Sequence, residues 1–103
     1  MPADPEVYTV TINSDYEPDP DPAEVPVGWN LEVVPPTGGC TICLDKDLGG
    51  SKAINLSSSK IFDLSGHKLN DTWGYDIVPY ETACPSVKKR NASHSIVISS
   101  GGE

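Results

Sequence analysis

The sequence predicts an all-β fold: a small antiparallel β-sandwich forming a single domain over residues 1–103. Prolines and glycines, 10 and 9 of 103 residues, interrupt every window long enough for three helical turns. Short runs in which apolar and polar residues alternate recur along the chain, as they do in half-buried strands. Turn-forming residues separate these runs, and no internal repeat or linker divides the chain.

The N-terminal third contains one clear strand and an acidic loop. In residues 6–13, Tyr8, Val10 and Ile12 fall on one face, and valine and threonine fall on the other. Residues 14–24 then contain three consecutive acid–proline pairs. Proline lacks a backbone donor and disfavours helical geometry in the residue before it, so we expect this loop to be stiff, extended and solvated.

The rest of the chain is predicted as short strands joined by turns and loops. Residues 29–34 and 40–44 alternate clearly, and a Pro-Pro-Thr-Gly-Gly turn separates them. We predict a polar loop over residues 45–52, a turn at 65–67 and a long loop over 79–92. The remaining predicted strands are residues 53–56, 60–64, 73–78 and 94–99.

The formal charge of −8 is concentrated in the first third of the chain. Residues 1–34 hold eight acids and no Lys or Arg, whereas seven acids face seven bases from Leu44 onward. This distribution argues against sequence-independent binding of nucleic acid, which requires cations that displace counterions from phosphates. It argues equally against docking on an anionic membrane. The acidic loop is a candidate contact for a basic protein.

The first residues, MPADPEVYTV, lack the basic patch and apolar run of a secretory signal. No stretch approaches the roughly 18 apolar residues of a membrane span. We therefore expect a cytoplasmic protein, with a mature secreted form as the alternative.

Cysteine and histidine supply the candidate metal ligands. Cys40, Cys43 and Cys84, with His94 or His67, would give a Cys₃His set for zinc. Strand residues three apart point to opposite faces, however, so Cys40 would face the core and Cys43 would lie on the other side. Three roles for the cysteines stay open: structural thiols or a disulfide, a metal site, and redox chemistry. Because the chain has three cysteines, a disulfide leaves one thiol unpaired.

A longer pattern covers most of the chain. The order VYTVTI, VPVGWNLEVV, a cysteine, WGYDI, Cys84 and HSIVIS resembles a cupredoxin-type domain. That family opens with a strand, a valine-containing turn and a second strand, after which the first copper histidine follows. It ends with a tyrosine-bearing strand, a cysteine, a histidine-containing loop and a closing strand. The resemblance implies a cupredoxin-like Greek-key β-sandwich.

The copper ligands of that family are not reproduced. Blue copper requires two His, one Cys and usually an axial Met, but the single methionine here is Met1. Cys40 or Cys43 stands near the position of the first histidine, and Cys84 stands roughly at the copper cysteine. The resemblance therefore implies that Cys84 pairs with Cys43 or Cys40 in an oxidising compartment, with the two cysteines on neighbouring loops at one end of the sandwich.

No nucleophile elbow or phosphate-binding glycine loop occurs, so we predict that the chain is not an enzyme and expect no cofactor. We predict a non-catalytic binding or structural module that contacts another protein, as a monomer or weak dimer. Its contact surfaces would be residues 35–40, 65–72 and 79–93 at one end of the sandwich, or the acidic loop. The alternative is a metal-binding protein that holds zinc or copper with Cys40, Cys43, Cys84 and His94.

Overall fold

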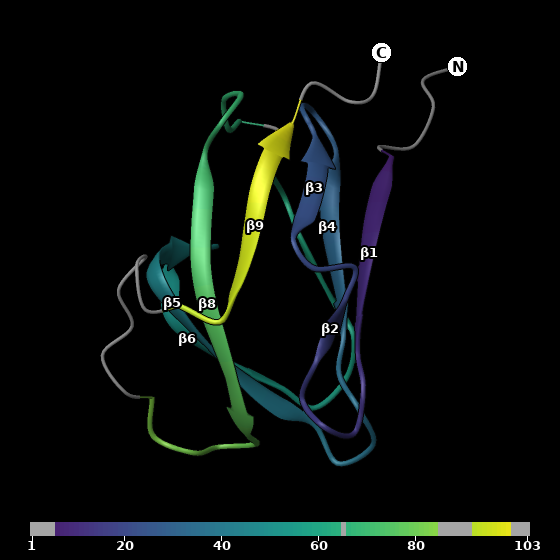
Figure 1. The fold of residues 1–103 in the computed structure, drawn as a ribbon, viewed down its shortest axis with the longest axis vertical. Coiled ribbons are helices and arrows are strands. Elements are labelled where there is room, and N and C mark those ends of the chain that lie inside the picture. Colours follow the sequence, from purple (N-terminus) through teal and green to yellow (C-terminus); the bar gives the residue numbers. More distant parts are fainter. Residues whose placement is uncertain (1–5, 65, 85–91, 100–103) are drawn as a thin grey trace.

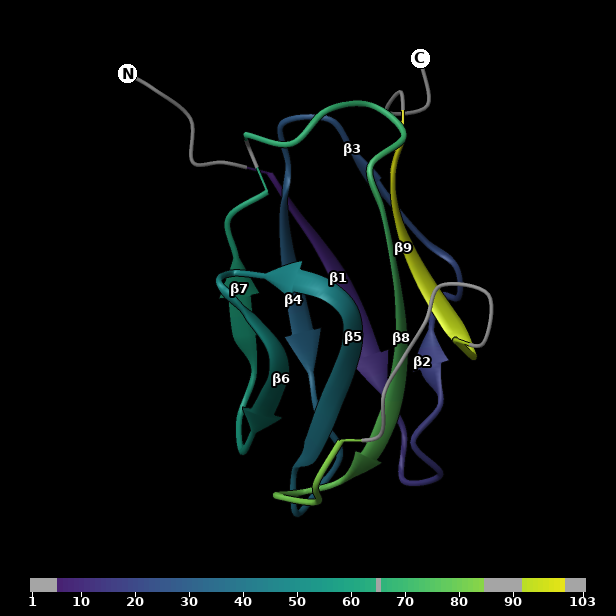
Figure 2. The same ribbon diagram turned by 90° about the vertical axis from the view of Figure 1, so that its left-hand side faces the viewer.

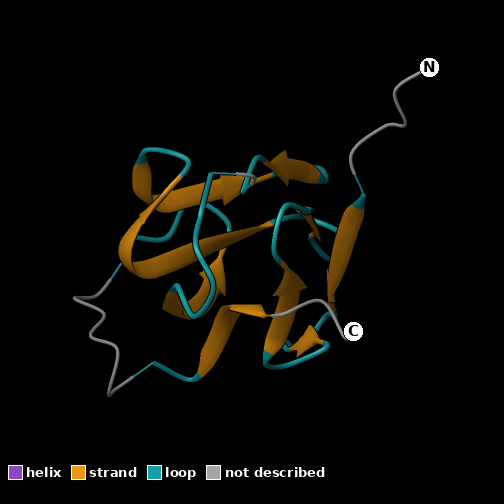
Figure 3. Ribbon diagram, turned by 90° about the horizontal axis from the view of Figure 1, so that it is seen from above, coloured by secondary structure: helices purple, strands orange, loops and turns teal. Residues whose placement is uncertain are grey.

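The computed structural model describes residues 6–64, 66–84 and 92–99, and it confirms the predicted all-β sandwich. Figures 1 and 3 show strands joined by turns and loops throughout these ranges. The described ranges hold no helix with the length and hydrophobicity that a membrane crossing requires. Their strands are β1 (Val7–Ile12), β2 (Pro18–Asp19), β3 (Ala23–Pro26), β4 (Asn30–Val34), β5 (Cys40–Leu48), β6 (Ser51–Leu56), β7 (Lys60–Phe62), β8 (Thr72–Pro79) and β9 (His94–Ser99).

The strands form two facing sheets, and both sheets are mixed. Sheet A has the order β2-β1-β4-β7, and sheet B has the order β3-β9-β8-β5-β6 (Figure 2). The predicted antiparallel arrangement is wrong for two pairs, because β1 and β4 run parallel, as do β3 and β9. The chain leaves sheet A after β2, contributes β3 to sheet B and returns as β4. A crossover of this kind brings two strands of the same direction together.

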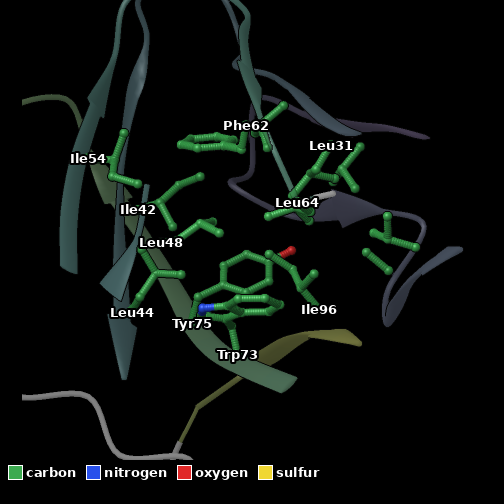
Figure 4. Close-up of a cluster of buried hydrophobic side chains, with 14 of the residues drawn as sticks. Leu31, Ile42, Leu44, Leu48, Ile54, Phe62, Leu64, Trp73, Tyr75 and Ile96 are labelled. Atoms are coloured by element: carbon green, nitrogen blue, oxygen red, sulfur yellow. The ribbon is translucent and has the colours of Figure 1, made fainter. Parts of the chain in front are cut away.

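The hydrophobic core fills the space between the sheets. Trp73 and Tyr75 of β8 are its largest side chains, and they are 0% and 2% exposed. Figure 4 shows both rings among aliphatic side chains from several strands. Other core residues include Val10, Ile12, Leu31, Val33 and Phe62 from sheet A and Ile42, Leu44, Ile54, Leu56, Ile96 and Ile98 from sheet B.

The acidic segment 14–24 is extended, as predicted, but it is more than a solvated loop. It contains β2 and the start of β3, each at the edge of its sheet, and Pro18 and Ala23 are buried. Proline fits an edge strand because its missing N–H does not interrupt a ladder of hydrogen bonds. The carboxylate-bearing residues Asp19 and Glu24 remain exposed.

The predicted polar loop at residues 45–52 is wrong, because β5 and β6 form a hairpin there. β5 continues to Leu48, and Gly49 and Gly50 form a two-residue turn with φ angles of 64° and 89°. Positive φ at both turn positions matches the right-handed twist of hairpin strands. A register shift between Cys43 and Leu48 bends β5, and Leu48 returns to the core.

The three predicted contact loops do not share one end of the sandwich. Residues 35–39 lie near the end of β8, where Gly39 approaches Tyr80. Residues 66–71 lie at the opposite end (Figure 1), where the Asn70 N–H donates to the carbonyl of Ile98 in β9. Much of the third loop, residues 85–91, falls outside the described residues.

Candidate functional site

Both faces of β5 are buried near its start, and this shows where another segment of the chain packs on the sheet. The five residues Cys40–Leu44 are all buried, although alternate side chains of a strand point to opposite sides. Cys40, Ile42 and Leu44 face the core. Thr41 and Cys43 face away from it, so another part of the chain must cover this outer face of sheet B.

Residues 80–84, which follow β8, provide that cover. Cys84 forms a disulfide with Cys43. The Glu81 N–H donates to Thr41 Oγ1 at 2.8 Å, and the Thr41 hydroxyl donates to Asn55 Oδ1 at 2.6 Å. The start of the β8–β9 connection is therefore fixed to the outer face of sheet B.

The disulfide confirms that Cys84 pairs with one of the two candidate cysteines, and the structure selects Cys43. Its predicted placement is wrong, because Cys43 lies within β5 rather than on a loop at the end of the sandwich. Cys40 keeps a free thiol that is 0% exposed. Burial raises the pKa of this thiol to about 11.

The four predicted metal ligands are not brought together. Cys43 and Cys84 are consumed by the disulfide, and Cys40 faces the core on the opposite side of β5. His94 begins β9 and contacts Asp21 and Tyr75 instead. Within the part of the chain that the structure describes, no three His, Cys, Asp or Glu side chains are grouped to hold a metal ion. The strand period explains this separation, since residues three apart cannot share a face.

A pocket of about 500 Å³ opens over β8 and the start of β9. Gly74 and Ser95 are paired across the two strands and both line it. Gly74 has no side chain to fill the space above the sheet. The described residues that line it are Asp21, Pro22, Thr72, Gly74, Ala92, Ser93, His94 and Ser95.

Asp21 connects the pocket wall to β9. Its Oδ2 lies 2.9 Å from Nδ1 of His94, and its Oδ1 accepts a hydrogen bond from the Ser95 N–H at 3.4 Å. The His94 ring lies 5.4 Å from the ring of Tyr75. Burial first, and the Asp21 charge second, raise the pKa of Tyr75 above its usual value. Asp21 thus places a negative charge where the pocket meets the edge of the core.

A second carboxylate fixes the far end of the β8–β9 connection. Asp76 of β8 accepts a hydrogen bond from the Ser93 N–H at 2.8 Å. Together with the Asp21 contacts, this bond holds residues 93–95 against sheet B. The connection is consequently anchored at both ends on the sheet that carries the pocket.

Comparison with protein-family models, curated proteins and solved structures gives no match. Function must therefore be inferred from the site itself. Sequence reasoning singled out His94 but missed Asp21, Gly74 and Asp76. The alternation in WGYD does place Gly74 and Asp76 on the polar face of their strand, which was the available signal. Asp21 and His94 are 73 residues apart, and no local pattern links them.

A separate cluster around Trp73 has a structural role. The His67 ring packs edge-on against Trp73 at 4.8 Å, and Lys46 Nζ lies 4.8 Å from the indole ring centroid. Trp73 Nε1 donates to the carbonyl of Asp47 at 2.9 Å. The Lys68 backbone N–H and His67 both bond to the Asp71 carboxylate and lower its pKa. These contacts hold residues 66–71 against β8.

Proposed function

We propose that this chain is a non-catalytic binding module that contacts another protein through the outer face of sheet B. The observation that carries the proposal is the anchored β8–β9 connection beside an open pocket. A disulfide at Cys84 holds its start, and the bond from Ser93 to Asp76 holds its end. The described ends of the connection, residues 80–84 and 92–93, are loop residues held on a rigid scaffold, and such residues often carry binding contacts.

The contacts of His94 support binding rather than catalysis. A hydroxyl activated by a neighbouring imidazole must also be accessible to a substrate if it is to act as a nucleophile. Among the described residues, the His94 ring contacts Asp21 and Tyr75. The Tyr75 side chain is 2% exposed and burial raises its pKa, so its hydroxyl stays protonated and out of reach of a substrate. The disulfide likewise supports a structural use of Cys43 and Cys84 over the alternative of a zinc or copper site.

We further propose that the protein works in an oxidising compartment, since disulfides persist there and are rare in the cytosol. The Cys43–Cys84 bond therefore favours the mature secreted form over the cytoplasmic location. The cupredoxin-like Greek key is kept as a proposal for the fold family. Its support is the chain order in which Cys84 follows the tyrosine-bearing β8 and precedes the closing strand β9.

The strands at the edges of the two sheets support the proposal that the protein is a monomer or a weak dimer. The edge strands of sheet A, β2 and β7, have two and three residues. In sheet B, the edge strand β3 ends in Pro26, and β6 carries the exposed Lys52. Short edges, prolines and lysines all oppose edge-to-edge pairing of two chains.

Site-specific photocrosslinking in extracts of the source cells tests the binding proposal. A benzophenone side chain replaces the exposed Ser93 beside the pocket, and in a control variant it replaces the exposed Thr11 on sheet A. We expect a discrete crosslinked protein from position 93 and none from position 11. Failure to crosslink from position 93, or the same products from both positions, would contradict the proposal.

A further inference from the structure

The pocket beside β8 and β9 has the size of a ligand site. Its volume of about 500 Å³ lies within the roughly 300–1,000 Å³ of typical ligand pockets. It is open to solvent on the outer face of the sheet, and its floor includes the backbone of Gly74. A long side chain from a partner protein can enter such a pocket without any change in the sheet.

Several of the hydrogen-bonding groups that line the pocket can accept a bond from a ligand. The N–H groups of Ser93 and Ser95 already donate to Asp76 and Asp21. The Thr72 hydroxyl donates to the carbonyl of Asn70, which leaves its oxygen as an acceptor. Each oxygen of the Asp21 carboxylate accepts one bond from the protein and has capacity for another. A ligand that supplies N–H donors is therefore complementary to this lining.

The charged side chains that the structure describes around the pocket are negative. Asp21 lines it and its side chain is 31% exposed. Glu24 lies exposed on the neighbouring edge strand β3, which pairs with β9. Among the lining residues that the structure describes, none is Lys or Arg. Partly buried charges of this kind are less screened by salt than fully exposed ones, so they select the sign of a ligand.

We propose that the pocket receives a lysine or arginine side chain of the partner protein, with Asp21 as its counter-ion. This inference rests on the proposed function and adds the chemistry of the contact. Arginine fits best, because its planar guanidinium donates several N–H bonds in a fixed geometry and pairs with a carboxylate. Asp21 is itself held by His94 and Ser95, so the carboxylate is positioned before the ligand binds.

The test uses N-acetyl-arginine methylamide as the probe and the isosteric, uncharged citrulline compound as its control. Both are titrated into the ¹⁵N-labelled full chain, and backbone amide shifts are followed by NMR. We expect saturable shifts at Gly74, Ser93 and Ser95 with arginine, and binding at least about tenfold weaker with citrulline. Asp21→Asn should abolish the shifts. Asp19→Asn changes an exposed carboxylate two residues away that does not line the pocket, and it should leave them unchanged.

A second variant keeps the test informative if Asp21→Asn disturbs the fold. Gly74→Val places a branched side chain on the floor of the pocket but retains every charge, and we expect it to weaken arginine binding. Equal binding of citrulline, or equal loss in the Asp19 and Asp21 variants, would overturn the inference. So would arginine binding that requires prior replacement of Lys88, Lys89 and Arg90 by Gln, because the chain's own cations would then be the occupant.

If crosslinking from position 93 succeeds while arginine binding fails, only this inference is lost, and the proposed binding module stands.

Discussion

Cys40 illustrates how position on a strand determines the chemistry of a single side chain. It is three residues from Cys43, yet one thiol lies in the core and the other forms the disulfide. The alternation of the strand separates them, and burial keeps the Cys40 thiol protonated at neutral pH. The residue therefore behaves as a small core hydrophobe, as the sequence pattern predicted.

The raised pKa of Cys40 predicts a loss of stability in alkali. Below the usual thiol pKa of 9.0 both states are protonated, and stability is unaffected. As the pH rises from 9.0 towards about 11, the unfolded chain loses its thiol proton first and unfolding is favoured, by up to about 2–3 kcal/mol. Tyr75, whose pKa is also raised, adds to the effect at higher pH.

Urea unfolding measured rapidly at pH 7, 9 and 10.5 checks this prediction. Cys40→Ala should be less stable than the wild type at pH 7 because it leaves a cavity, but its stability should fall less steeply with pH. Parallel pH dependence in the two proteins would show that the thiol does not contribute.

Gly38 and Gly39 form a matched pair for testing a backbone requirement. Both have positive φ, 93° and 83°, which costs a non-glycine residue about 1–2 kcal/mol. A Cβ at Gly38 would meet nothing, whereas a Cβ at Gly39 would lie 2.6 Å from the carbonyl oxygen of Leu56. We expect Gly38→Ala to lower the unfolding free energy only by this backbone cost, and Gly39→Ala to lower it by about 1–3 kcal/mol more. Thermal denaturation measures both, and equal losses would contradict the close approach.

Among the larger elements, the β8–β9 connection depends most on a single covalent bond. The disulfide links residues 41 positions apart and does not join the two sheets. It fastens residues 80–84 across the outer face of β5. A loop of this length corresponds to about 4 kcal/mol in the chain-entropy treatment, and measured values for native disulfides are commonly 2–5 kcal/mol.

Replacing Cys43 and Cys84 together by Ala should therefore lower the unfolding free energy by about 2–4 kcal/mol. The core side chains remain in place, so we expect an all-β circular dichroism spectrum. Hydrogen exchange at the Glu81 amide should accelerate, because its bond to Thr41 is no longer held in register. Unchanged exchange at Glu81 would show that other contacts fix the connection.

Strong alternation made most strands predictable, and polar or proline-rich strands were missed. Residues 29–34 and 94–99 each bury one face, residues 40–44 alternate in sequence although both of their faces are buried, and the structure has strands at all three positions. The hairpin at 45–52 was predicted as a loop because its polar residues lie on an exposed edge, where burial imposes no pattern. Its Gly-Gly pair was a usable turn signal. The short strands in 14–24 were missed because prolines normally argue against sheet structure.

At the scale of the whole molecule, the candidate site depends on contacts that no local pattern encodes. Asp21 reaches His94 only because β3 pairs in parallel with β9. The register of that pair is set by packing of both strands against the common core. The sequence could thus identify the polar face of β8 and the cysteines available for pairing, but it could not show that Asp21 forms part of the pocket.

The distribution of charge gives the last prediction. The acids in residues 6–34 have no Lys or Arg among them, so their mutual repulsion opposes folding at low salt. Replacing Asp15, Glu17 and Asp19 by their amides should preserve the fold and raise stability by about 0.5–1 kcal/mol at 10 mM salt, an effect that disappears at 500 mM. Asp21→Asn should instead lower stability by about 1 kcal/mol, because its carboxylate holds His94 and Ser95.

Urea titrations of the triple variant and of Asp21→Asn at both salt concentrations separate the two effects. The side chains of Asp15, Glu17 and Asp19 are exposed, whereas the neighbouring Pro18 is buried. The backbone of this segment therefore packs as part of the sheet, and its carboxylates are solvated. If the triple variant unfolds, its carboxylates must be packed or bound to a cation, and the acidic segment would have to be reassigned from an electrostatic surface to a binding site.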